Sequence, residues 1–435
     1  MGADAHWVAV PRDRDEQPVQ CCGAFTADLY ALAEWLRQCQ IATVVMESTG
    51  VYWIALFEVL EARGFDVKLV DPHAVRQVPG RKTDVKDCQW LQELHTYGLL
   101  RGAFRPKDEI CVLRSYLRHR SMLVAMAART VQHMQKALEQ MHLKLTEVVS
   151  EITGKTGMTI IRAILAGERD PQRLATSRDK RCTHDHTTIA KALTGHWRAE
   201  HLFAWQQAVD QSDCIEQQLR ACDAQIEGCL QAFVPDVEAD APQSTPVRTW
   251  RSSRSNPPSF DVQAYLEAMT GVDLTQINGI DSLTALKVMS EIGLDMTRWP
   301  TSKHCASWLG LCPGNNMSGG KRYRMRSKPS ANRAATALRL AAQGVANSHS
   351  ALGAYYRRMR ARLGAPKAMT ATAHKLARLV YSMLRYGTAY VDAGQQAYDQ
   401  KYRDRVLTNL QRKAKAFGYK LVHVEDIDGG VPSTF

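Results

Sequence analysis

The residue whose surroundings most clearly suit a chemical reaction is a serine in a glycine-rich stretch. Ser318 follows Pro313 and Gly314 and directly precedes Gly319 and Gly320, which predicts a loop outside helix and strand. A serine hydroxyl is a weak nucleophile without nearby cations or a base, and cations also offset the charge that builds on an attacked phosphate. Cationic residues follow the serine at Lys321, Arg322, Arg324 and Arg326. The stretch is typical of a serine presented to a phosphodiester, with a solvated glycine-rich turn as the alternative.

Three carboxylates near the N-terminus have a pattern that suits a metal ion. Glu47 ends an apolar stretch that predicts a buried strand, and open α/β sheets place their sites at such strand ends. Asp84 and Asp87 are three residues apart, so on a helix they share one face. Hard oxygen ligands suit Mg²⁺, and metal ions held by carboxylates can clamp a phosphodiester. The alternatives are a solvated strand end and a helix N-terminal carboxylate.

Two basic residues precede the paired aspartates. Arg81 and Lys82 lie in the loop that opens the helix of Asp84 and Asp87. We expect both side chains to contact a nucleic-acid backbone, because cations beside a metal site would meet the phosphates there.

Composition narrows the class of protein. The 435 residues carry a net charge of +12, which favours a polyanionic partner. The eleven cysteines form no CxxC pair and no disulfide-like framework, and we find no signal peptide and no apolar run long enough to span a membrane. We therefore expect a reduced cytoplasmic protein. The segment 182–186, Cys-Thr-His-Asp-His, could suggest zinc but lacks a fourth ligand, which favours a polar loop.

The elements that must position the carboxylates form a predicted α/β domain over residues 1–103. Periodicity predicts strands at 6–10, 18–22, 43–47 and 66–70, and helices at 26–38, 51–63 and onward from 84. Residues 104–234 are predicted to be helical. Leu117, Val124, Val131, Leu138 and Leu145 recur every seven residues, which indicates a long helix that pairs either within its own domain or with another chain.

The C-terminal part is predicted to be mostly helical and to bind nucleic acid. Residues 235–262 are a linker, richest in Pro, Ser, Asp and Arg at 236–258, and residues 263–435 form the last domain. The turn at 277–280 could offer backbone amides to a phosphate, although a plain packing turn is favoured. No Asp or Glu occurs from Lys321 to Arg385, whereas a solvated helical surface would mix both signs. The predicted nucleic-acid face includes Arg333 and Lys375.

Five motifs together resemble one family. They are 46–53 (Met-Glu-Ser-Thr-Gly-Val-Tyr-Trp), 79–88 (Pro-Gly-Arg-Lys-Thr-Asp-Val-Lys-Asp-Cys), 309–314 (Leu-Gly-Leu-Cys-Pro-Gly), 318–321 (Ser-Gly-Gly-Lys) and 370–377 (Thr-Ala-Thr-Ala-His-Lys-Leu-Ala). In this order and at these distances the chain resembles the DEDD transposases of bacterial insertion sequences, the IS110 group and especially its IS1111 branch. The resemblance covers nearly the whole length.

The resemblance implies a fold, an activity and partners. The fold class is α/β plus α: an N-terminal RuvC-like (RNase H) domain, a helical coiled-coil middle region and a mostly helical C-terminal transposase domain. Glu47, Asp84 and Asp87 match three of the four Asp-Glu-Asp-Asp carboxylates that bind Mg²⁺, and Ser318 matches the nucleophile. The implied partners are DNA at the element ends and target, a structured non-coding guide RNA that pairs with both DNAs, and further copies of the chain in a dimer or tetramer. No membrane is implied, and the location would be the bacterial cytoplasm at the nucleoid.

One position departs from the family pattern. The family's first aspartate stands in a strand that precedes the segment matched by residues 6–11, and neither that strand nor that aspartate is found here. Asp4 matches a turn position instead. We expect either a native product that begins upstream or a decayed element. Two other functions stay open: a metal-dependent junction-resolving nuclease that uses water, and a non-catalytic nucleic-acid-binding relic.

Overall fold

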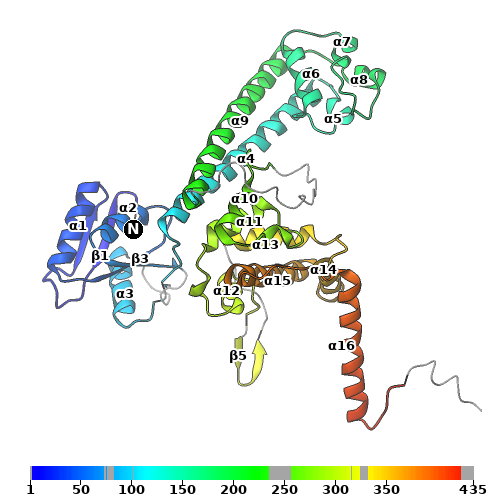
Figure 1. The fold of residues 1–435 in the computed structure, drawn as a ribbon. Helices are drawn as coiled ribbons and strands as arrows, with labels where there is room; N and C mark the ends of the chain where they lie inside the picture. The colour runs from blue at the N-terminus through cyan, green and yellow to red at the C-terminus, as the bar shows by residue number, and fades with distance from the viewer. Residues whose placement is uncertain are drawn as a thin grey trace, which may run out of the picture. The chain divides into compact units, whose positions relative to one another are not determined.

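The computed structural model describes residues 2–72, 75, 83–100, 102–234, 256–314, 316–323 and 332–422. The chain divides into two compact units, an N-terminal unit (Met1–Pro106) and a C-terminal unit (Lys107–Phe435), which are coloured from blue onward along the chain in Figure 1.

The N-terminal unit contains two separate pairs of strands. β1 (Ala5–Ala9) and β2 (Val19–Gly23) are antiparallel, with Ala5 opposite Gly23. β3 (Thr43–Glu47) and β4 (Asp66–Val70) are parallel, with Thr43 opposite Asp66. No hydrogen-bonded ladder joins the two pairs among the described residues. The four strands therefore form two half-sheets of two strands each.

Helices pack on these half-sheets because their apolar residues share one face. α1 (Thr26–Gln38) buries Leu29, Leu32 and Leu36, and α2 (Trp53–Ala62) buries Leu56, Phe57 and Leu60. These side chains form one core with Met46 of β3 and Leu69 of β4. α3 (Asp84–Thr96) packs against β1 and β3, yet none of its residues is buried. The helix therefore meets open space as well as protein.

The C-terminal unit begins with a helical hairpin. α4 (Asp108–Gln140) pairs along its length with α9 (Ala199–Phe233). Tyr116 hydrogen-bonds Gln225, and Arg120 pairs with Asp223, whereas Met134 packs in the same cluster as Trp205. This order makes the two helices antiparallel. Four of the predicted heptad positions, Leu117, Val124, Val131 and Leu138, thus lie on a helix whose partner is in the same chain, whereas Leu145 begins α5. Supercoiling stays a prediction.

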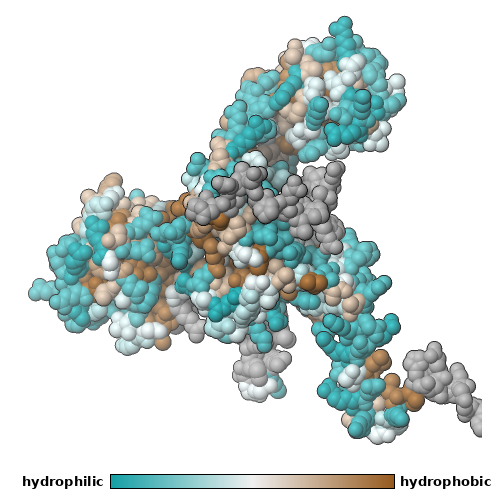
Figure 2. Space-filling model, viewed as in Figure 1, coloured by the Kyte–Doolittle hydropathy of each residue, from teal (hydrophilic) through white to brown (hydrophobic). Residues whose placement is uncertain are grey.

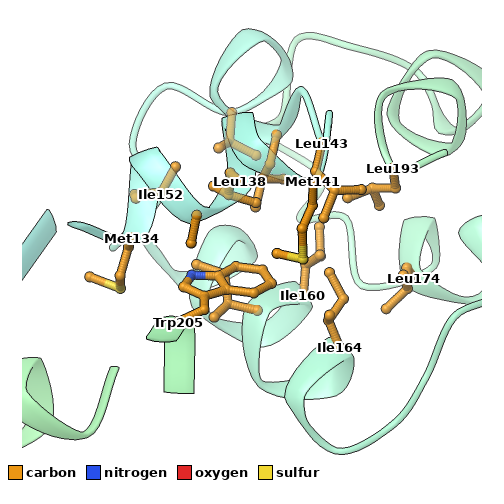
Figure 3. Close-up of a cluster of buried hydrophobic side chains, with 14 of the residues drawn as sticks. Met134, Leu138, Met141, Leu143, Ile152, Ile160, Ile164, Leu174, Leu193 and Trp205 are labelled. Atoms are coloured by element: carbon orange, nitrogen blue, oxygen red, sulfur yellow. The ribbon is translucent and has the colours of Figure 1, made fainter. Parts of the chain in front are cut away.

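A helical cap closes the far end of the hairpin. It consists of α5 (Leu145–Val148), α6 (Lys155–Leu165), α7 (Pro171–Ala175) and α8 (His186–Ala192). Figure 3 shows Trp205 surrounded by apolar side chains of the hairpin and the cap, including Leu138, Met141 and Ile160. The surface of the cap is mostly hydrophilic in Figure 2. Asp185 of the segment 182–186 caps α8: it accepts from the Thr187 hydroxyl at 2.6 Å and from the Thr188 amide at 3.0 Å. Hydrogen bonding, most strongly from the Thr187 side chain, lowers the pKa of Asp185 to about 2.

The remaining helices form the C-terminal bundle. Their bounds are α10 (Val262–Thr270), η2 (Leu274–Gln276), α11 (Ser282–Ile292), η3 (Met296–Arg298), α12 (Ser302–Trp308), α13 (Arg333–Gly344), α14 (Ala351–Leu363), α15 (Ala365–Tyr386) and α16 (Gly394–Ala416). α15 packs against α12, α13 and α14, and α16 packs against α14. A short hairpin of β5 (Asn316–Ser318) and β6 (Lys321–Tyr323) lies between α12 and α13 in the sequence.

Buried charges fix the base of the α4–α9 hairpin to this bundle. The Arg120 guanidinium donates to both oxygens of Asp223, at 2.5 and 3.4 Å, and to the carbonyl of Asn256. Asp223 also accepts from the Ser259 amide at 3.0 Å. Because both charged groups are buried, each needs these partners to offset its lost hydration. The pair therefore connects both hairpin helices to the segment that enters the bundle.

Candidate active site

The three predicted carboxylates line one cavity in the N-terminal unit. The cavity has a volume of about 900 Å³ and is bounded by β1, β3 and one face of α3. Glu47 lies at the C-terminal end of β3, as predicted, and Asp84 and Asp87 lie in the first turn of α3. Thr83 caps this helix by accepting from the Lys86 amide at 3.3 Å. The fold thus brings the strand end and the helix start to the same cavity.

The two strand edges that face this cavity have backbone groups without a hydrogen-bond partner among the described residues. The Val10 amide donates to the Pro18 carbonyl. In the antiparallel register the backbone N–H and C=O groups of Val8 and Val10 therefore point towards β2, and those of Trp7 and Ala9 point away from it. The Asp66 amide donates to Ala42 and the Ser48 amide to Val70. Because successive residues of a strand direct their backbone N–H and C=O groups to opposite sides, those of Thr43 and Val45 point away from β4.

Both sets of outward-facing residues line the cavity. Trp7 and Ala9 of β1 and Thr43 and Val45 of β3 contribute to its wall, as do the residues that alternate with them along both strands. An extended segment placed there would find donors and acceptors on two sides, because adjacent strands pair about 4.8 Å apart. The wall of the cavity therefore offers backbone groups with which an extended segment could pair.

The donor chemistry of the cavity suits a hard cation, but the described carboxylates do not converge on one. Glu47, Asp84 and Asp87 supply the oxygen ligands that Mg²⁺ prefers. No group of three His, Cys, Asp or Glu side chains in the described part of the chain is close enough to hold a metal ion. Asp4, the matched turn position, is exposed and is not part of the cavity wall. Among the described residues the arrangement therefore lacks a complete set of metal ligands.

A histidine that the sequence reading missed positions α3 beside β3. His95 Nε2 lies 2.9 Å from Thr43 Oγ1, and His95 lines the cavity together with Leu91. Partial burial lowers the pKa of His95, Lys68 lowers it further and Asp66 opposes the shift. The sequence contained a signal for this histidine: a spacing of three, four and four residues places Asp84, Asp87, Leu91 and His95 on one face of a helix.

The serine lies in a hairpin and not in the predicted loop. Ser318 is the last residue of β5 and is paired with Lys321 of β6. Gly319 and Gly320 have φ of +56° and +75°, as the two central residues of a type I′ turn require. This turn matches the twist of paired strands, so the glycines connect strands here instead of excluding them. The prediction that Ser318 stands outside helix and strand is wrong.

The predicted cationic residues fall into three groups. Arg324 and Arg326, together with Arg81 and Lys82, lie outside the described residues. The side chains of Lys321 and Arg333 are exposed, Lys321 on β6 and Arg333 as the first residue of α13, and Arg322 belongs to β6. Lys375 is half-buried on α15, 4.8 Å from the ring centroid of Tyr355.

The turn at 277–280 has a packing role. Gly279 has φ of +91°, and a Cβ added there would lie 2.4 Å from Val345 Cγ1 and 2.7 Å from the Ala341 carbonyl oxygen. Only glycine fits this close approach to α13. Packing therefore accounts for this turn, which was the favoured interpretation.

Two family models match the chain. A model of IS110-type DEDD transposases, described as a transposase, matches residues 1–143, and one described as the transposase IS116/IS110/IS902 family matches residues 273–357. The chain belongs to the IS110 family of DEDD transposases. The first match includes Glu47, Asp84 and Asp87, and the second includes Ser318. No curated protein matches the chain.

Membership of the IS110 family sets a coarse function. It associates the chain with transposition and DNA binding, and it gives the N-terminal unit the character of a DEDD transposase domain. None of the helices in the described ranges is long and apolar enough to cross a membrane.

Proposed function

We propose that this IS110-family protein catalyses DNA strand cleavage and exchange, excising and inserting its element with Ser318 as the nucleophile. The observation that carries the proposal is the pair of family matches, which separately include the carboxylate cavity and the serine hairpin. The type I′ hairpin supports it, because a two-residue turn holds the end of β5 in a defined conformation.

The proposed step is a transesterification. The Ser318 hydroxyl oxygen forms a bond to phosphorus, the bond from phosphorus to a deoxyribose oxygen breaks, and the hydroxyl proton passes to solvent or to the leaving oxygen. The phosphoserine bond conserves the energy of the cleaved bond for rejoining to another strand. Lys321, Arg322 and Arg324 would offset the charge that builds on the phosphate.

We propose that Glu47, Asp84 and Asp87 bind Mg²⁺ in the active protein. The support is that all three line the same cavity and offer hard oxygen ligands. A bound Mg²⁺ would polarise the attacked phosphate. A ligand set that is incomplete among the described residues requires a further contribution, and the two open strand edges indicate where it would enter.

We propose that an extended segment with a carboxylate completes the cavity by pairing with β1 and β3. We propose this position for the strand that the resemblance implies before the segment 6–11. A chain extended at its N-terminus by an apolar strand containing aspartate should cleave DNA with Mg²⁺ better than the chain of Met1–Phe435. Equal cleavage by both chains would show that the strand adds nothing.

The proposed partners are DNA, a structured non-coding RNA and further copies of the chain as a dimer or tetramer. The support is the net charge of +12 and the absence of Asp and Glu from Lys321 to Arg385. Recombination that depends on transcription of the element's flanking DNA, and that follows a changed guide sequence, would support RNA guidance. Recombination with purified protein and DNA alone would contradict it.

Single substitutions with matched controls test the chemistry. Ser318→Ala should abolish excision and insertion while DNA binding stays near normal, whereas Ser307→Ala, an exposed serine on α12, should be active. Asp84→Asn should also abolish both reactions, with Glu93→Gln on the same helix as its control. Full recombination by the Ser318→Ala variant would exclude the serine assignment.

Two other functions make different predictions. A junction-resolving nuclease that uses water would cut DNA with Mg²⁺ and form no covalent bond to protein. A non-catalytic relic would bind nucleic acid without cutting it. Mg²⁺-dependent cleavage by this chain would exclude the relic.

A further inference from the structure

Two cations and three tyrosines form a cluster where α14, α15 and α16 meet. The Arg358 guanidinium of α14 lies 4.0 Å from the ring centroid of Tyr402 and 4.9 Å from that of Tyr398, both on α16. The Lys375 ammonium of α15 lies 4.8 Å from the ring of Tyr355 and 5.5 Å from that of Tyr398. The two cations therefore share the Tyr355 and Tyr398 rings.

The cluster contains positive charge without a paired carboxylate. Neither Arg358 nor Lys375 forms an ion pair with a described Asp or Glu. The acidic residue that acts on Lys375 is Asp392, which attracts the ammonium from beyond ion-pair distance. The Asp392 carboxylate already accepts from the Ala351 amide at 3.0 Å and the Gly394 amide at 3.3 Å, at the starts of α14 and α16. It is therefore engaged as a helix cap.

Burial and a neighbouring cation make the positive charges of Arg358 and Lys375 unfavourable. Both cations are half-buried, and Arg378 lies one turn beyond Lys375 on α15. Burial lowers the pKa of Lys375, and Arg358 and Arg378 lower it further. Cation–π contacts offset only part of the cost of placing like charges together. An anion would offset the rest and would accept hydrogen bonds from both side chains.

We propose that Arg358 and Lys375 together bind one backbone phosphate of a nucleic acid, on a platform formed by Tyr355, Tyr398 and Tyr402. Arginine offers a planar fork of donors and lysine a compact charge, and both are used for phosphate recognition. Tyrosine rings beside cations are typical of surfaces that hold unpaired strands. The inference rests on the proposed function only in naming a nucleic acid as the partner, because it requires no cleavage.

Binding of labelled oligonucleotides tests the site apart from catalysis. The full chain with Ser318→Ala would be titrated with 20-nucleotide oligo-dT and oligo-U between 50 and 200 mM salt. Lys375→Met should lower affinity about tenfold and reduce the slope of log affinity against log salt by about 0.7. Lys367→Met removes the same charge from an exposed position on α15 and should change the affinity and the salt slope less. A loss confined to one oligonucleotide assigns the site to DNA or to RNA.

Amine acetylation provides a second measurement that requires no variant to fold. Bound oligonucleotide should protect Lys375 from acetylation and leave Lys367 reactive, as read by mass spectrometry. Equal acetylation of Lys375 with and without oligonucleotide, or equal slopes for Lys375→Met and the parent chain, would overturn the proposal and leave the cluster as an anchor for α16. A chain that binds neither oligonucleotide would instead contradict the proposed function.

Discussion

The base of the α4–α9 hairpin and the cavity of the N-terminal unit differ in how their polar groups are buried and paired. At the hairpin base, Arg120 and Asp223 are buried and reach each other and two backbone groups. At the cavity, carboxylates and the outward edges of β1 and β3 face open space. Polar groups that are buried against each other stabilise one arrangement, whereas polar groups that line a cavity can be reached by a ligand or a further strand. The first region therefore acts as scaffold, and the second is where we expect chemistry.

The largest effect should come from breaking the buried pair. Asp223→Ala leaves the Arg120 guanidinium buried without its partner, which should lower the free energy of unfolding by about 3–5 kcal/mol. Glu216→Ala is the control, because its pair with Arg220 is exposed and contributes about 0.3–0.5 kcal/mol. Urea unfolding followed by circular dichroism would compare the two variants. Equal midpoints for both would show that the buried pair does not hold the hairpin base.

A glycine in the scaffold should be nearly as sensitive. Gly279→Ala forces a Cβ against Val345 and Ala341 at positive φ, which should lower the free energy of unfolding by about 2–3 kcal/mol. Gly344→Ala at the end of α13 meets no atom within 4 Å and should instead stabilise by about 0.5–1 kcal/mol. Opposite signs in the two unfolding curves are expected. A neutral Gly279→Ala would mean that α13 can move away.

Hydrogen exchange should show the open edges directly. The amides of Trp7 and Val45, which face the cavity, should exchange at least about tenfold faster than those of Val8 and Met46, which face a partner strand. Tenfold corresponds to about 1.4 kcal/mol of local opening free energy. Residue-resolved exchange by NMR would measure both sets. Equal protection would mean that something already pairs with both edges.

The smallest effect is a pH dependence of the stability of the N-terminal unit. Burial lowers the pKa of both His6 and His95 below the ordinary value of 6.5. The unfolded chain therefore binds protons first, so stability is complete above about pH 6.5 and falls as the pH drops through 6.5 towards the folded pKa values. Hydrogen exchange of β3 at pH 7.5 and 5.5, corrected for intrinsic rates, would detect the loss. His95→Gln should weaken the dependence, whereas His133→Gln on α4 should not.

The elements that local patterns specify were predictable from sequence. The predicted helix at 26–38 and the strands at 43–47 and 66–70 match α1, β3 and β4. Apolar periodicity is a local property, and these segments pack in the way that their own pattern requires. The observed bounds of β1 and β2 each differ by one residue from the predicted strands at 6–10 and 18–22, because the ends of a strand depend on which residues of the neighbouring strand pair with it.

Other features depend on contacts that the sequence does not record. The heptads of α4 indicated a partner helix, but α9 in the same chain supplies it only after the cap reverses the chain. Gly319-Gly320 fits both a loop and a type I′ turn, and pairing of the flanking residues decides between them. The cavity arises because two half-sheets are not joined, which requires the three-dimensional arrangement of four strands.

The most direct test of the account is a search for a covalent bond between the protein and DNA. The protein would be trapped during cleavage of its element's end, digested with nuclease and protease, and analysed by mass spectrometry. We predict a nucleotide attached to the peptide that contains Ser318, and its loss in Ser318→Ala. DNA cleavage with no attached nucleotide, or attachment at another residue, would contradict the serine mechanism.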